Sequence, residues 1–511
     1  MSRSITRSLL RPYRCVTHPW QHNQLRTYYY ALNVNDPRNN KELFVVPQTA
    51  FRTIVINQPE TKHTLTYTLL DRLYTILNAI DAHNDLAGCI VVSQDMGNRI
   101  YTTGTDTLAL YNDGILAQKQ LSQNVQPSNA LQYNYITLCY NLLYLTSNMR
   151  KPYISMMDGL VMGSGYAIAG NGRFRLATQN TTILYNECQY GLIPHYGSIY
   201  ILSRLCGKLG YWLGITGLQL NGADVFHCGY ATHYVDPSAA QAIESSFTAM
   251  TPHRLTGQYA VDNVMIDYSE IPLFTYAKHM DYVDELFTNN HTMESIVQQL
   301  ESTVTSGNIN DINSTAYLAK RALDNIYRSS PLALKLTLSC LQLADTLSYE
   351  RCLQLEYRVI SELYQRNDYY SAVKNNIIEQ NSTIPQWQYK SLNSVNDRIV
   401  DKIIAEHDDP RDELQLNKPD HTLHWVQGQP NHMKKDGKLY NKFDRGTADP
   451  SSVVTDNNIG VTPDDINKLF DPNQSVVYNH DMNDSDIDEL ARAVGIDPSV
   501  LTNAAPFKHR H

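Results

Sequence analysis

Short apolar strands alternate with helical segments along the first part of the chain, and this alternation constrains the fold more than any other feature. The strand-like runs are rich in β-branched residues, and they cover residues 44–46, 53–57, 89–93 and 153–158. The helical runs repeat Leu and Ile at helical spacing, and they cover residues 69–82 and 136–145. This order predicts a folded α/β body.

Two turns in this body are placed to present backbone N–H groups. Residues 101–106 follow the strand at 89–93, and Gly163-Ser164-Gly165 follows the strand at 153–158 and opens a helix. A glycine-rich helix N-terminus offers converging amide donors and a positive dipole end, which suits an oxyanion or a polarised thioester carbonyl. Such glycines can also serve only to let a helix pack closely on a sheet.

Composition excludes several classes of protein. The 511 residues are 42% hydrophobic, which is enough for at least one large core, and the formal net charge of −9 gives no overall basic footprint for nucleic acid. The 8 cysteines form no CxxC pair and have no His partner at metal-ligand spacing, so we expect free thiols and no metal site. No apolar run approaches the roughly 20 residues of a membrane span.

The N-terminus carries a targeting signal. No acidic residue occurs before Asp36, and the first 28 residues hold five arginines among serines and apolar side chains. A cationic amphipathic helix of this kind suits import driven by a negative-inside potential. We therefore expect a mitochondrial presequence over residues 1–28 and a matrix protein. The alternative is a basic disordered arm that binds RNA or a membrane surface.

Four motifs carry a family resemblance, and they lie at residues 171–178, 229–235, 330–338 and 355–358. In these motifs the chain resembles the enoyl-CoA hydratase/isomerase (crotonase) superfamily, and more closely its 3-hydroxyisobutyryl-CoA hydrolase branch. The likeness spans roughly residues 43–406. It implies a crotonase (ClpP-like) spiral of ββα units over residues 43–250, which forms an acyl-CoA pocket, and a helical part over residues 251–405. It implies no cofactor, with coenzyme A as part of the substrate.

The resemblance also assigns the oxyanion donors and the substrate-binding positions. The two donors are the backbone N–H groups of Thr105 and Ser164. Ser164 stands where the family uses glycine, so its Cβ is expected to crowd the thioester or to disallow the required backbone angles. The substrate-binding positions implied by the resemblance are Lys62, His63, Gly104, Gly163 and Gly165.

The expected acids differ most from the family pattern. The resemblance assigns the principal catalytic carboxylate to Glu187, whereas the second acid is replaced by His195 and the third by Cys139. An imidazolium at His195 is expected to pair with Glu187 and to lower its basicity. In the alternative, His195 itself acts as the general base. A Cys188 nucleophile beside His195 is a further alternative, and a purely structural reading makes Cys139 a core residue.

The C-terminus has a different composition. Residues 406–461 are rich in Asp, Asn, His, Pro and Gly, so we expect a flexible linker there. Residues 462–511 are expected to form a largely disordered acidic tail with two short helices, the first starting at the capping sequence Thr462-Pro463. Such a tail suits docking to a partner, but it can equally be a solvated appendage.

Two functions follow from these features. The first is a mitochondrial member of the hydrolase branch with impaired or lost thioester hydrolysis, used mainly as a structural component. In several eukaryotic lineages the branch includes a protein of the small subunit of the mitochondrial ribosome, whose partners are ribosomal proteins and rRNA. The alternative is an active 3-hydroxyisobutyryl-CoA hydrolase of valine breakdown that uses Glu187 with or without His195.

Overall fold

The computed structural model describes residues 42–47, 51–83, 85–94, 99–123, 131–249, 258–288, 291–406 and 413–417. The expected presequence and the acidic tail with its two helices lie outside the described residues. Within the described part, no helix is long and apolar enough to cross a bilayer.

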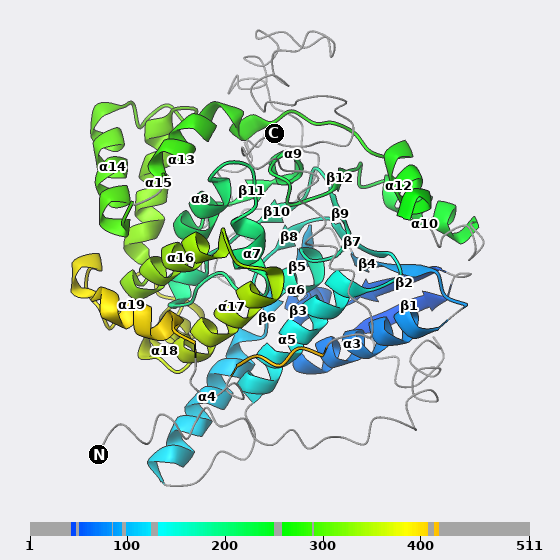
Figure 1. Cartoon of the computed structure of the whole chain (residues 1–511), viewed down its shortest axis with the longest axis horizontal. Coiled ribbons are helices and arrows are strands. Elements are labelled where there is room, and N and C mark those ends of the chain that lie inside the picture. Colours follow the sequence, from blue (N-terminus) through cyan, green and yellow to red (C-terminus); the bar gives the residue numbers. More distant parts are fainter. Residues whose placement is uncertain are drawn as a thin grey trace, which may run out of the picture.

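A six-stranded sheet runs along one side of the fold, to the right of the centre in Figure 1. Its order is β1 (Leu43–Pro47), β2 (Phe51–Ile56), β4 (Gly88–Ser93), β7 (Tyr153–Met157), β9 (Phe174–Ala177) and β12 (His233–Tyr234). Only β1 and β2 pair antiparallel; every later pair is parallel. The strands expected at 44–46, 53–57, 89–93 and 153–158 are therefore confirmed as β1, β2, β4 and β7.

Two smaller sheets lie beside the first. One has the order β11 (Leu220–Asn221), β10 (Thr182–Ile183), β8 (Leu160–Val161) and β5 (Ile100–Thr102), and the other pairs β3 (Thr64–Leu65) with β6 (Gly104–Thr105). Each turn of the chain places one strand in the large sheet and the following strand in a smaller one, as in β4–β5, β7–β8 and β9–β10. This is the expected spiral of ββα units, which is confirmed.

Helices of the spiral pack on one another behind the turns. α3 (Tyr67–Ala82) begins where the Thr66 side chain accepts a hydrogen bond from Leu69 N, and α5 (Leu131–Asn148), which packs on it, is buried along most of its length. The sequence pattern predicted both helices but not α4 (Thr107–Ser122). In α4 only Leu110 and Gly114 are buried, so no apolar stripe marks the helix.

The remaining helices follow the sheets. Short helices α6 (Gly165–Ala169), η2 (Glu187–Tyr190), α7 (Ser198–Leu202), α8 (Leu209–Thr216) and α9 (Gly222–His227) complete the spiral. α10 (Ala239–Ala249) and α12 (Gln258–Asp267) cover one face of the large sheet, where Phe247 stacks on Phe51 with ring centroids 4.5 Å apart. A second group, which we call the helical cap, comprises α13 (Met280–Leu286), α14 (Met293–Ser306), α15 (Thr315–Arg328), α16 (Pro331–Ala344), α17 (Tyr349–Leu363), α18 (Asn367–Val373), the π-helix η4 (Lys374–Ile378) and α19 (Asp397–Ile404).

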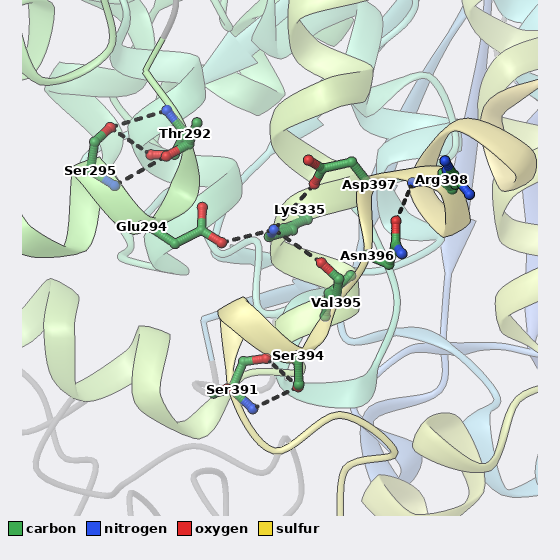
Figure 2. Close-up of polar contacts among 10 residues, drawn as sticks. All are labelled: Thr292, Glu294, Ser295, Lys335, Ser391, Ser394, Val395, Asn396, Asp397 and Arg398. Atoms are coloured by element: carbon green, nitrogen blue, oxygen red, sulfur yellow. Dashed lines mark hydrogen bonds and ion pairs between the residues drawn. The ribbon is translucent and has the colours of Figure 1, made fainter.

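The helical cap is joined internally by Lys335 of α16. Its Nζ lies 2.8 Å from Glu294 Oε1 of α14, 3.2 Å from Val395 O and 3.3 Å from Asp397 Oδ1 at the start of α19 (Figure 2). The Lys335 side chain is only 13% exposed, so these contacts are partly shielded from water. These contacts join α14, α16 and α19 of the helical cap.

One short piece of the predicted linker packs onto the body. Glu413 Oε1 accepts from Arg358 Nε of α17 at 2.8 Å, and Leu414 is buried. Asn417 N donates to Asn141 Oδ1 of α5 at 2.8 Å, and its amide reaches the Tyr74 hydroxyl of α3 at 3.1 Å. Residues 413–417, orange in Figure 1, therefore cross from the helical cap to the helices of the spiral.

Candidate active site

A cavity of about 210 Å³ lies between the glycine turns of the spiral and the helical cap. The sequence-predicted residues that line it are Thr105, Gly163, Glu187 and His195. The cap contributes Tyr364, Tyr369 and Ile377. No local sequence signal marks these cap residues, because they reach the cavity through packing between segments that lie far apart in the chain.

Glycine is required where the two turns meet. Gly104 has φ +78°, and a Cβ there would lie 2.2 Å from Met162 O, which is a clash with backbone. Gly163 has φ +54°, and a Cβ there would lie 3.4 Å from both Thr105 N and Thr105 Oγ1. Gly163 therefore leaves the amide of Thr105 uncovered on the cavity side. Gly104 and Gly165 lie behind the lining rather than in it.

The side chain of Ser164 turns into the core. Its hydroxyl lies 2.7 Å from the Tyr135 hydroxyl of α5, which itself donates to Leu65 O at 2.8 Å. Its backbone has φ −63° and ψ −6°, an ordinary helical conformation, and the residue is fully buried. The expected conflict of Ser164 with the backbone angles is therefore wrong, because the positive φ falls on Gly163, and its hydroxyl is directed away from the cavity.

A second polar contact occupies the amide of Ser164. Ser164 N donates to Thr105 Oγ1 at 3.2 Å, so the hydroxyl of one turn accepts the hydrogen bond of the other turn's amide. A carbonyl oxygen can use the Ser164 N–H only after the Thr105 hydroxyl has moved. Thr105 and Gly163 line the cavity, whereas Ser164 is fully buried next to them and is not part of the lining. We call these three residues the amide wall.

The opposite side of the cavity carries Glu187, the first residue of η2. The residue is 5% exposed, and neither carboxyl oxygen has a hydrogen-bond partner. Burial raises the pKa of Glu187 to about 8, so the carboxyl is mostly protonated at neutral pH. The expected ion pair with an imidazolium, which would lower this pKa, is therefore wrong.

His195 lies beside the same cavity and is 2% exposed. Its Nδ1 is 2.8 Å from Ile193 O, to which it donates, and its Nε2 has no hydrogen-bond partner. Burial lowers the pKa of His195 to about 4, so the ring is neutral. We call Glu187 and His195 the carboxyl–imidazole wall.

Buried contacts fix the loop that carries His195. The ring of Tyr196 lies 4.1 Å from that of His195, between centroids, and the backbone of Tyr196 is left-handed with φ +59°. Glu356 of α17 accepts hydrogen bonds from Gly197 N and Ile199 N, both at 2.7 Å, and from the Tyr140 hydroxyl at 3.2 Å. Burial raises the pKa of Glu356 to about 8. Its role is to hold the loop, since both carboxylate oxygens are engaged.

Asp106, which the sequence did not single out, is a second carboxylate that lines the cavity. Asp106 accepts a hydrogen bond from Ala109 N at 3.1 Å and thereby caps α4. Its sequence signal was available, since an Asp that precedes a helix is a frequent cap. The Asp106 carboxylate therefore stabilises the start of α4 and does not bind Glu187.

The other predicted residues do not line the cavity. Cys139 is fully buried on α5, and burial raises the pKa of its thiol. Cys188 Sγ lies 3.3 Å from Thr337 Oγ1, on the side of α16, and burial raises the pKa of this thiol to about 12, which argues against a nucleophilic thiolate.

The early loop is also structural. His63 Nδ1 accepts from Gln58 N at 3.1 Å, and its Nε2 is 3.1 Å from Gln94 O. Lys62 O accepts from Thr103 N at 3.2 Å. Both residues thus hold the loop between β2 and β3 in place. Among the described residues, no cluster of three or more His, Cys, Asp or Glu side chains could hold a metal ion.

The fold and this cavity define a known class. The family model described as enoyl-CoA hydratase/isomerase matches residues 51–404, so the chain belongs to the enoyl-CoA hydratase/isomerase family. Within it, the chain is 27% identical over 354 residues to the mitochondrial 3-hydroxyisobutyryl-CoA hydrolase of Gallus gallus, covering 68% of this chain and 84% of that protein.

Further relatives agree with this class. Probable 3-hydroxyisobutyryl-CoA hydrolase 2 of Arabidopsis thaliana is 28% identical over 374 residues, which cover 73% of this chain and 93% of that protein. Among solved structures, a carnitinyl-CoA dehydratase from Mycobacterium thermoresistibile aligns with a TM-score of 0.63 and 25% identity, covering 74% of this chain and all of that one (100%). The crotonase fold is thereby shown.

Proposed function

We propose that this protein is a mitochondrial matrix member of the 3-hydroxyisobutyryl-CoA hydrolase branch with strongly reduced thioester hydrolysis. In this proposal it acts mainly as a structural component of the small subunit of the mitochondrial ribosome. The observation that carries the reduced activity is the hydrogen bond from Ser164 N to Thr105 Oγ1 at 3.2 Å.

The reason lies in what hydrolysis requires. When water attacks a thioester carbonyl, negative charge develops on the carbonyl oxygen, and two amide donors stabilise it. Loss of one such donor typically costs about 10²–10³ in rate. In the amide wall one of the two donors is already bonded to Thr105. The reaction also needs a base, and a Glu187 carboxyl with a pKa of about 8 is ionised in only a minority of molecules at pH 7.

The structural part of the proposal rests on the segments outside the family match. The match ends at residue 404, whereas the chain continues to His511, and residues 413–417 hold the start of this extension against α17, α5 and α3. The described residues 413–417 of this extension are therefore attached to the body. Such a segment suits contact with ribosomal proteins or rRNA in a large assembly.

Glu187 favours a second candidate, an active 3-hydroxyisobutyryl-CoA hydrolase. A buried carboxyl without a partner, facing a cavity and with a pKa near neutral, is the typical arrangement of a catalytic acid or base. In this candidate ionised Glu187 takes the proton of the attacking water. The Thr105 hydroxyl rotates away so that the carbonyl oxygen accepts from both amides.

Two measurements test the proposal. Purified protein is assayed with 3-hydroxyisobutyryl-CoA, and we expect turnover well below the about 1–10³ s⁻¹ typical of enzymes. Turnover within that range would support the second candidate instead. Mitochondrial lysate is then sedimented through a sucrose gradient; we expect the protein in the small-subunit fractions, and its presence in light fractions alone contradicts the ribosomal role.

A further inference from the structure

We infer that Tyr135 is a positioning residue of the amide wall, and that its hydroxyl, acting through Ser164, keeps the second amide donor bonded to Thr105 instead of free for a ligand. The inference rests on the proposed function and deepens it, because it names the side chain that holds the hydrolytic site in its occupied state. Tyr135 does not line the cavity. It acts on the reaction only through the two turns.

Tyr135 is bonded to the strand that lies beside the Thr105 turn. The residue is 1% exposed on α5, and its hydroxyl donates to Leu65 O of β3 at 2.8 Å. β3 pairs with β6, and in this pair Leu65 lies opposite Thr105. The single proton of the Tyr135 hydroxyl is therefore used on β3, and its oxygen is left as an acceptor.

Ser164 uses this acceptor. The hydroxyl oxygens of Tyr135 and Ser164 lie 2.7 Å apart, and since the Tyr135 proton is already donated to Leu65 O, it is Ser164 that donates to Tyr135. Ser164 is fully buried, so bulk water does not compete for its hydroxyl. One tyrosine hydroxyl thus connects the side chain of Ser164 to the strand beside Thr105.

This connection sets the direction of the Ser164 amide. Ser164 N donates to Thr105 Oγ1 at 3.2 Å, which is at the long end of the usual range of about 2.7–3.2 Å for such a bond. A bond of this length is weak by itself and depends on how the two turns are held. Tyr135 holds both turns, because it is bonded to Ser164 in one and to the strand paired with the other.

The hydroxyls of Tyr135, Ser164 and Thr105 form one buried cluster. Burial raises the pKa of Tyr135 well above its usual range, and the hydroxyls of Ser164 and Thr105 lower this pKa, so both lie next to the tyrosine oxygen. A Thr105 hydroxyl that donates to Tyr135 presents a lone pair to Ser164 N. The tyrosine thereby favours the orientation of Thr105 in which the amide is occupied.

Removing the Tyr135 hydroxyl is expected to release the Ser164 amide. In Tyr135→Phe the buried hydroxyl of Ser164 loses its acceptor, and because an unpaired buried hydroxyl is costly, Ser164 turns toward another partner. The long bond from Ser164 N to Thr105 is then easily displaced by the carbonyl oxygen of a thioester. Two amide donors instead of one become available to the transition state.

The test is steady-state hydrolysis of 3-hydroxyisobutyryl-CoA by the full chain, arranged as a double-mutant cycle. We expect Tyr135→Phe to raise kcat by about threefold to tenfold and to leave KM nearly unchanged, because the released donor acts on charge that develops in the transition state. In Thr105→Ala the amide is already free. Tyr135→Phe should therefore add less than about twofold in that background.

Two further variants separate positioning from packing, and thermal unfolding shows that each variant is folded. Ser164→Ala removes the same hydrogen bond from its other end and keeps the amide, so it should give a gain like that of Tyr135→Phe; it also takes the place of Tyr135→Phe if that variant does not fold. Tyr153→Phe removes another buried tyrosine hydroxyl, which donates to Ile168 O at 2.6 Å rather than to the amide wall. Its kcat should stay at the level of the unchanged protein.

Three results overturn the inference: no gain in kcat for Tyr135→Phe and Ser164→Ala, an equal gain for Tyr153→Phe, or the same gain in the Thr105→Ala background. The proposed function fails on a different measurement, which is the absolute rate of the unchanged protein. Turnover of the unchanged protein at ordinary enzyme rates contradicts reduced hydrolysis, whereas the inference depends only on ratios between variants.

Discussion

The two walls of the cavity differ in whether their polar groups are hydrogen-bonded within the protein. In the amide wall the groups satisfy one another, since Ser164 N–H is bonded to the Thr105 hydroxyl and the Ser164 hydroxyl to Tyr135. In the carboxyl–imidazole wall, Glu187 and the outer nitrogen of His195 are buried without partners. In the amide wall, the protein itself thus occupies one of the two amide donors, whereas the polar atoms of the other wall have no partner. In the proposed function, the occupied donor accounts for the reduced hydrolysis of an acyl-CoA ester.

The largest effect is expected where the carboxyl–imidazole wall is anchored. Glu356→Leu removes the acceptor of Gly197 N, Ile199 N and the Tyr140 hydroxyl and leaves three buried donors unpaired. We expect the free energy of unfolding to fall by about 3 kcal/mol or more, measured by denaturant titration. Glu356→Gln, which keeps one acceptor oxygen, should lose clearly less. Equal stability of Glu356→Leu and the unchanged protein would show that the loop is held by other contacts.

Opening the amide wall should restore activity. Thr105→Ala keeps the backbone amide of residue 105 and removes the hydroxyl that occupies Ser164 N, so we expect turnover of 3-hydroxyisobutyryl-CoA to rise about tenfold to hundredfold. Thr105→Ser is the matched control, because it keeps the hydroxyl and loses only a methyl group. A similar gain in both variants would mean that the hydroxyl is not what limits the reaction.

The protonation of Glu187 predicts a pH dependence of stability. The folded pKa of about 8 lies above the value of about 4.3 in the unfolded chain, so the folded state binds more protons between these pH values and stability falls as the pH rises through this window. In Glu187→Gln this contribution is absent. We expect the unchanged protein to lose about 1–2 kcal/mol relative to Glu187→Gln between about pH 6 and pH 7.5.

The comparison with Glu187→Gln isolates one group. Burial also raises the pKa of Glu356 to about 8, and Glu356 is present in both proteins, so its contribution cancels in the difference. Parallel stability curves for the two proteins would indicate that Glu187 is ionised in the fold. That result would support an ion pair between Glu187 and His195.

The smallest effect is expected far from both walls. Lys335→Met removes the contacts that join α14, α16 and α19, and because two of its partners are partly or largely exposed, at 32% and 88%, we expect a loss of about 1 kcal/mol. Turnover of 3-hydroxyisobutyryl-CoA should not change. A change in turnover would mean that the contacts of Lys335 within the helical cap also affect the cavity.

The sequence predicted the fold and part of the site. Strand and helix periodicity is local, so β1, β2, β4, β7, α3 and α5 were all recognisable. The meeting of the turns at Thr105 and Ser164 was also expected, because the resemblance pairs them. α4 was missed because most of its side chains face solvent, and helix formation there depends on packing and on the cap at Asp106.

The electrostatics of the site could not be predicted in the same way. His195 was expected to be charged because it was placed beside the Glu187 carboxylate, but its charge depends on burial and on the bond of Nδ1 to Ile193 O, which are tertiary properties. Similarly, the backbone angles of Ser164 were expected to be unfavourable, but the positive φ falls on Gly163, one residue earlier, where glycine allows it. Sequence identified some of the residues that meet at the cavity, whereas their protonation depends on how deeply the fold buries them.

The most direct test is a crystal structure with a non-hydrolysable analogue of 3-hydroxyisobutyryl-CoA, in which a methylene group separates the sulfur from the carbonyl carbon. Our account predicts that Ser164 N remains bonded to Thr105 Oγ1 when the analogue is bound. An analogue whose carbonyl oxygen accepts from both Thr105 N and Ser164 N, with the Thr105 hydroxyl displaced, would contradict it.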